Sequence, residues 1–157
     1  MLTLIAFVCL LLAIPALLGV RWTYVVFILL GLAYFPLRVG FRFDPQPCEL
    51  LSTAKYLLLS FTNYGHIARF ALFFAMSLAQ MHKGLRPTTA GFVFAGIAGL
   101  TMGVLVELAE GVTGRGNCRL RDLIPDSVGM LLGALGVTLW HRTRQAGPWP
   151  GTADLAE

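Results

Sequence analysis

The fold of this chain is decided by the stretch Gly99–Gly133, GLTMGVLVELAEGVTGRGNCRLRDLIPDSVGMLLG, in which acids and arginines lie between two apolar segments typical of membrane helices. On insertion scales, a carboxylate or guanidinium at the middle of a membrane helix costs roughly 2.5–3.5 kcal/mol. A cluster of such groups is therefore paired, placed at the water boundary, or functional.

The composition of the whole chain points to the same class of protein. Over 157 residues, 57% are hydrophobic and 13% are charged, and the mean hydropathy is +0.74. These values lie far outside those of soluble globular domains. We therefore expect an all-α integral membrane protein, folded as a single membrane domain over residues 1–157 because no linker or internal repeat divides the chain.

The formal net charge of +4 does not indicate nucleic acid as a partner. The 12 Lys and Arg residues are scattered among apolar helices and form no basic face. Attraction to anionic lipid headgroups, or the orientation of the chain in the membrane, explains a charge of this kind.

The apolar runs predict a compact bundle of about five transmembrane helices. They cover residues 2–20, 22–39, 66–81, 88–108 and 123–140, and a polar tail occupies residues 145–157. The first run has neither the preceding positive charge nor the cleavage site of a secretory signal peptide, so we interpret it as a span. Apolar residues at helical spacing from Leu50 to Phe61 predict a short interfacial or re-entrant helix, and an early start of the third span is the alternative.

The orientation of this bundle is not fixed by counting charges. The positive residues are nearly equal in number on its two faces, so the positive-inside rule does not choose between them. If the loop arginines near Asp122 belong to a site and are discounted, the C-terminus lies inside and the N-terminus outside.

The three cysteines have no ligand-like spacing, so they predict no metal site. Cys48 and Cys118 fall in loops on the same side of the predicted membrane. A disulfide between them requires that this side is oxidising. We expect two free thiols.

Ionisable residues mark three helix ends that meet at one membrane face, because consecutive spans run antiparallel. This polar rim consists of His66, Arg69, Glu107, Glu110, Asp122 and Asp126. We predict catalytic roles for His66, Glu107 and Asp122. The predicted ligand-binding residues are Arg69, Glu110, Arg115, Arg119 and Asp126.

Small residues spaced four apart lie in line with these acids on two helices. The fourth span carries Ala95, Gly99, Gly103 and Glu107, and the fifth carries Asp122, Asp126, Gly129 and Gly133. Small residues at this spacing let helix backbones approach closely in lipid. We therefore expect the two stripes to pack against each other, which would turn Glu107 and Asp126 into the bundle.

Structural roles compete with functional ones for these residues. Asp122 suits the N-cap of the fifth span, a role compatible with function. Glu107 and Glu110 lie near a helix C-terminus, where negative charge is disfavoured and cationic partners are needed. The arginines would then form a structural salt-bridge network, which comprises Arg69, Arg115, Arg119 and Arg121. Two carboxylates and one histidine are too few ligands for a metal site. We therefore expect no cofactor.

The rim resembles the pattern of the VanZ-like family, small bacterial membrane proteins named for a member associated with teicoplanin resistance. That pattern has a His at the start of one helix, a Glu at the end of the next, a loop Arg, and an Asp followed by two Gly residues. The corresponding residues here are His66, Glu107, Arg115 with an offset of about one residue, Asp122, Gly129 and Gly133.

The chain also departs from the family pattern. Glu110 replaces a Gln, Asp126 replaces an Asn, and Arg119 stands where a Ser is common; Thr62 and Asn63 replace an Asp-Lys pair. The resemblance covers residues 62–140 and leaves the two N-terminal helices of residues 1–40 outside it. It implies a multi-pass protein of the bacterial cytoplasmic membrane with a role in envelope biology or glycopeptide tolerance.

Two functions fit these observations, and a third fits less well. The first is a site that binds, or acts on, an anionic amphiphile such as an envelope lipid or a lipid-linked glycan precursor, since arginines grip phosphate and His66 with Glu107 can form an acid–base pair. The alternative is a non-enzymatic subunit or assembly factor that binds another membrane protein. A proton-coupled transporter ranks last because the spans carry few polar groups away from the rim. The sequence does not decide whether a reaction is catalysed.

Overall fold

The computed structural model describes residues 2–39, 43–49, 60–82, 85–113 and 118–145, and it is helical almost throughout. The helices are α1 (Leu2–Leu17), α2 (Arg21–Val39), α4 (Tyr64–His82), α5 (Thr89–Thr113), the 3₁₀ helix η1 (Leu120–Asp122) and α6 (Leu123–Gln145). Within these ranges there is no strand, and the one isolated bridge joins Glu49 to Arg119. The all-α prediction is confirmed.

Each of the five predicted apolar runs forms a helix, with shifted ends. The first helix ends at Leu17, before the predicted end at Val20, because the chain reverses at Gly19, whose φ of 83° suits glycine. The fourth run continues past Leu108 to Thr113, so Glu110 lies within the helix. The predicted interfacial helix of residues 50–61 falls almost entirely outside the described residues.

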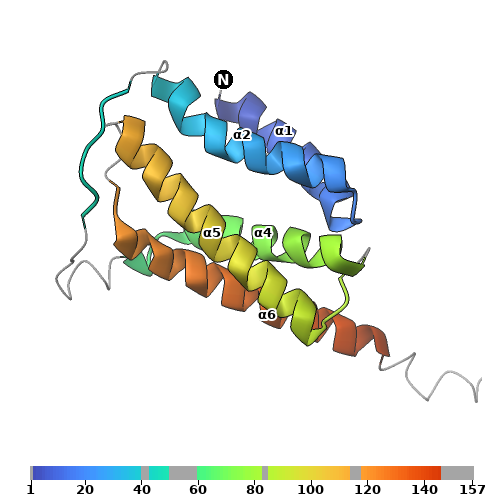
Figure 1. Cartoon of the computed structure of the whole chain (residues 1–157). Coiled ribbons are helices and arrows are strands. Elements are labelled where there is room, and N and C mark those ends of the chain that lie inside the picture. The colour runs from blue at the N-terminus through green and yellow to red at the C-terminus, as the bar shows by residue number, and fades with distance from the viewer. Residues whose placement is uncertain (1, 40–42, 50–59, 83–84, 114–117, 146–157) are drawn as a thin grey trace, which may run out of the picture.

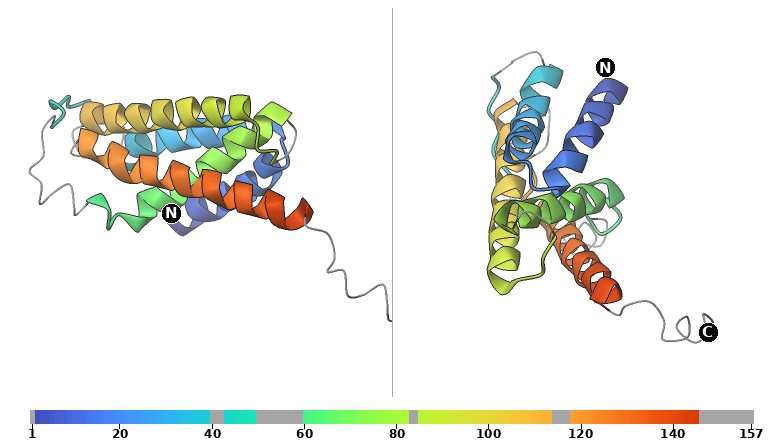
Figure 2. Two further views of the ribbon diagram at one scale, coloured as in Figure 1. Left: turned by 90° about the horizontal axis from the view of Figure 1, so that it is seen from below. Right: turned by 90° about the vertical axis from the view of Figure 1, so that its right-hand side faces the viewer.

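Helix α4 is the centre of the bundle (Figure 1). It packs against α1, α5 and α6, and its contact with α6 is the most extensive in the molecule. Helix α4 contributes more buried apolar side chains than any other helix that the structure describes, among them Met76 and Leu78. Helices α1 and α2 diverge from the turn that joins them (Figure 2), and the Tyr24 hydroxyl of α2 lies 2.8 Å from Ser77 Oγ of α4.

Gly129 and Gly133 of α6 pack against the backbone of α4. A Cβ on Gly133 would lie 2.7 Å from the carbonyl oxygen of Ala71, and one on Gly129 would overlap the carbonyl oxygen of Ile67. The predicted packing of the two small-residue stripes against each other is therefore wrong for Gly129 and Gly133 and holds where Gly103 of α5 meets Asp126 of α6. Next to that contact, Gly99 of α5 receives the side chain of Met130.

Two of the described helical segments are long and apolar enough to cross a membrane, against the five predicted spans. They are Thr89–Thr113 and Leu120–Gln145, with mean hydropathies of 2.0 and 1.5. Shorter apolar stretches occupy Phe7–Leu17 and Arg21–Tyr34. The outward faces of these helices carry large apolar side chains in numbers unusual for a soluble protein, including Leu11, Leu29, Ile97, Leu108, Leu131 and Leu135.

Candidate functional site

The rim contains a buried carboxylate bonded to a histidine from another helix. Asp126, in the first turn of α6, is 2% exposed, and its Oδ1 lies 2.8 Å from Nδ1 of His66 in the first turns of α4. The close approach of Gly129 to α4 brings these two helix ends together. Because a carboxylate accepts, Nδ1–H donates, and this bond leaves Nε2 as the other proton-exchanging atom of the ring.

Glu107 of α5 is the second buried acid, with 1% of its surface exposed. Its Oε2 accepts a hydrogen bond of 2.6 Å from the backbone N–H of Arg119. Its Oε1 has no donor among the residues that the structure describes. A buried carboxylate oxygen without a donor is unfavourable, so this atom is prepared to accept a hydrogen bond from a bound group.

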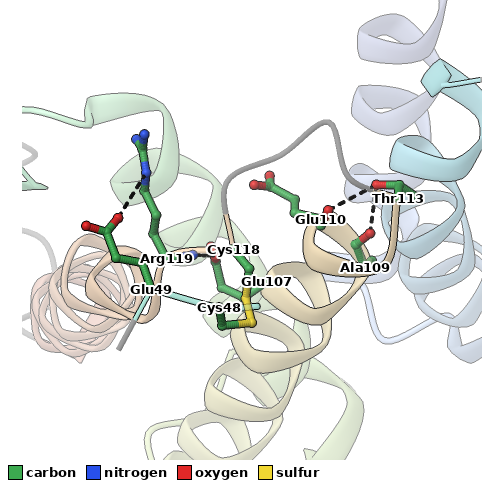
Figure 3. The surroundings of a disulfide bond; sticks show 8 residues. All are labelled: Cys48, Glu49, Glu107, Ala109, Glu110, Thr113, Cys118 and Arg119. Carbon is green, nitrogen blue, oxygen red and sulfur yellow. Dashed lines mark hydrogen bonds and ion pairs between the residues drawn. A yellow bond between two sulfur atoms is a disulfide. The ribbon is translucent and has the colours of Figure 1, made fainter. Parts of the chain in front are cut away.

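The Arg119 side chain turns away from Glu107 (Figure 3). Its Nε lies 3.7 Å from Oε2 of Glu49, and the two residues also form the isolated bridge. The prediction that a cation neutralises Glu107 is therefore wrong for Arg119, which supplies a main-chain donor instead. The donor lies directly before η1, whose N-cap is Arg119.

The segment of residues 43–49 covers the end of α5. Asp44 N–H donates to the Val112 carbonyl at 3.1 Å, and Gln46 N–H donates to the Gly111 carbonyl at 2.9 Å. The Thr113 hydroxyl donates to the carbonyls of the preceding turn at 2.9 and 3.2 Å (Figure 3). This segment therefore positions the rim, a role that the sequence interpretation missed.

Cys48 and Cys118 form a disulfide, so the expectation of two free thiols is wrong. Their Cα atoms lie 4.5 Å apart, within the usual range for a disulfide. The bridge between Glu49 and Arg119, one residue further along each segment, creates this proximity. The two loop cysteines on one predicted face were the only signal for it in the sequence.

The remaining predicted residues lie around this core or outside the described part. Arg69, Glu110 and Asp122 all interact electrostatically with His66. Arg69 Nε also donates to the Gly65 carbonyl of its own helix at 2.8 Å. Arg115 lies outside the described residues.

The described His, Cys, Asp and Glu side chains include no group of three arranged to hold a metal ion. The site combines a histidine held by one buried acid with a second buried acid that has one open oxygen.

Comparison of the chain with protein-family models, with curated proteins and with solved structures gives no match.

Proposed function

We propose that this chain is a multi-pass membrane protein of about five spans, with a polar rim that binds the headgroup of an anionic amphiphile. The apolar outer faces of α1, α2, α5 and α6 support membrane insertion, because exposed leucines of this number would favour aggregation in water. The described acids all belong to the rim or to the segment that covers it, so the apolar faces carry none of them.

The rim faces the extracytoplasmic side in this proposal. Disulfides persist in oxidising compartments, and the bond between Cys48 and Cys118 lies on this face. If the arginines of the rim are discounted as site residues, Arg21, Arg86 and Arg144 mark the opposite end as the cytoplasmic one, because cytoplasmic loops are enriched in such residues. The C-terminal end of α6 is then cytoplasmic, in the inner membrane of a bacterium as the VanZ-like resemblance implies.

The single observation that carries the ligand proposal is the open oxygen of Glu107. A buried carboxylate oxygen accepts hydrogen bonds from hydroxyl or amine groups, and Arg69 and Arg119 at the same rim suit phosphate. A lipid-linked glycan precursor carries sugar hydroxyls beside a phosphate. Its hydroxyls suit the open oxygen of Glu107 and its phosphate suits the arginines, so it matches the site better than a simple phospholipid does.

The histidine pair gives this site a group that can exchange protons. Asp126 fixes the orientation of the His66 ring through Nδ1, and the side chain of His66 remains 16% exposed. A ring held in this way can take a proton from a bound hydroxyl at Nε2 while Asp126 stabilises the cation. Binding is the first role of the rim, and acid–base chemistry on the bound headgroup is the second.

The alternative function is a non-enzymatic membrane subunit or assembly factor, whose polar rim is an internal clamp and whose partner is another membrane protein. The tight packing of Gly129 and Gly133 on α4 of the same chain fits this alternative as well. The open oxygen of Glu107 is the observation that favours the ligand site. Crosslinking in native membranes tests the choice, because reproducible capture of one protein partner without a bound lipid would favour assembly.

Glu107→Gln tests the proposed site most directly. The amide can still accept from the Arg119 N–H, but it presents NH₂ where Oε1 was, so we expect the co-purifying amphiphile to be lost while the melting temperature stays close to that of the wild type. Asp44→Asn is the matched control, because Asp44 is an exposed acid of the same face. Mass spectrometry of lipids retained in mild detergent gives the readout. Equal retention by a folded Glu107→Gln protein would refute the proposal.

A further inference from the structure

The end of the bundle opposite the rim contains a groove of about 360 Å³. It opens where the end of α1, the segment before α5 and the end of α6 meet, and Figure 1 shows these three ends on the same side of the molecule. Its apolar lining comes from Leu17, Leu18 and Leu85. Its polar lining comes from Arg86, His141 and Arg144, with Trp140 beside them.

The arginines of this groove are exposed and arranged for an anion. The guanidinium carbon of Arg144 lies 4.4 Å from the centroid of the Trp140 ring. Stacking on the ring fixes the plane of the guanidinium and leaves the N–H groups at its edge free to donate. Arg86, on a different segment, also lines the groove, so cations from two parts of the chain are present there.

The groove has no acidic neighbour in its own segments. Residues 1–43, 56–106 and 127–153 contain no Asp or Glu, and all the lining residues belong to these ranges. Among the residues that the structure describes, this end therefore provides cations without a matching anion. Apolar side chains lie directly beside the cations, which is the arrangement that an amphiphile requires.

We propose that this groove binds an anionic phospholipid of the membrane leaflet, with its phosphate between Arg86 and Arg144 and its upper acyl chain along Leu17, Leu18 and Leu85. Trp140 lies near the end of α6, at the level where aromatic residues anchor helices in the headgroup region. Basic pockets between membrane helices recognise anionic headgroups through the same chemistry. The inference rests on the proposed membrane insertion and is independent of the role of the rim.

The test measures lipid binding to the full chain after delipidation in detergent. Native mass spectrometry follows titration with phosphatidylglycerol and, separately, with phosphatidylcholine. We expect phosphatidylglycerol to bind more tightly. Arg144→Gln and Arg86→Gln should each weaken its binding about fivefold, the effect of one cation at a membrane surface, and leave phosphatidylcholine unchanged.

Arg142→Gln is the matched control, because Arg142 is exposed on the same helix and does not line the groove. Equal loss in Arg142→Gln and Arg144→Gln would overturn the groove in favour of general surface charge, and so would equal affinity for the two lipids. Displacement of the lipid by inorganic phosphate at a similar concentration would overturn the lipid as the occupant.

Glu107→Gln distinguishes this proposal from that of the rim. Glu107 lies at the other end of α5, so this variant should retain phosphatidylglycerol in the groove even where it loses the rim ligand. Loss of both lipids from a folded Glu107→Gln protein would contradict the existence of two separate sites.

Discussion

The contact between Gly129 and α4 gives the sharpest test of the fold. A methyl group added in Gly129→Ala would overlap the Ile67 carbonyl oxygen and lie 3.0 Å from Cβ of Phe70. Both neighbours are fixed parts of α4, so relief requires the two helices to separate. Overpacking of this kind typically costs about 1–3 kcal/mol, and the better helix propensity of alanine returns at most about 1 kcal/mol.

Gly136→Ala, further along the same helix, is the matched control. A Cβ there meets nothing within 4 Å, so only the propensity gain remains and stability should rise by about 0.5–1 kcal/mol. The difference between the two variants isolates the overpacking term, about 1–3 kcal/mol. The free energy of unfolding is measured by circular dichroism during titration of detergent-folded protein with dodecyl sulfate.

A third glycine, Gly99, provides a case between the other two. In Gly99→Ala the new methyl group meets the flexible side chain of Met130, which can move, so the loss should be smaller than in Gly129→Ala. Equal unfolding free energies for Gly129→Ala and Gly136→Ala would refute the packing of α6 against α4. A larger loss in Gly99→Ala than in Gly129→Ala would refute the assignment of the tighter contact.

Three further predictions each concern one interaction within the bundle. Reduction of the bond between Cys48 and Cys118, which are 70 residues apart, should lower the unfolding free energy by up to about 4 kcal/mol, and a chain with serine at both positions should show no response to reductant. A double-mutant cycle with His66→Ala and Asp126→Asn should give a coupling of about 1.5–3 kcal/mol in the same unfolding assay, and additive losses would contradict the pair. Tyr24→Phe should cost about 0.5–1.5 kcal/mol because it removes the hydrogen bond between α2 and α4, and an unchanged unfolding free energy would contradict that bond.

The helical class and the meeting of three helix ends could be predicted because both depend on local signals. Apolar runs fix the helices, and short connections make neighbours antiparallel, so His66, Glu107 and Asp126 converge on one face. The functional role of these residues stays a prediction. The packing of α6 on α4 pairs His66 with Asp126, and a main-chain donor from the segment before η1 pairs with Glu107; the sequence pattern specifies neither contact.

The predictions of stripe packing, of free thiols and of a cation at Glu107 differ from the structure for one physical reason. The spacing of residues along a helix identifies a contact surface but does not identify the segment that packs on it. Gly129 and Gly133 form a close-packing face, as their spacing predicts, but any helix backbone could occupy this face, and α4 does so. The disulfide depends in the same way on segment 43–49 lying beside Cys118. The donor to Glu107 is a main-chain group, which residue identity cannot reveal.

The cover over the end of α5 has an electrostatic consequence. A helix concentrates partial negative charge on its last four carbonyl groups, and this macrodipole end would repel the two glutamates beside it. Here the carbonyls of Glu110, Gly111 and Val112 accept bonds from the Thr113 hydroxyl and from the Gln46 and Asp44 amides. These donors offset the partial negative charge at the end of α5. The helix can therefore carry Glu107 and Glu110 in its last turns without a cation bound to each glutamate.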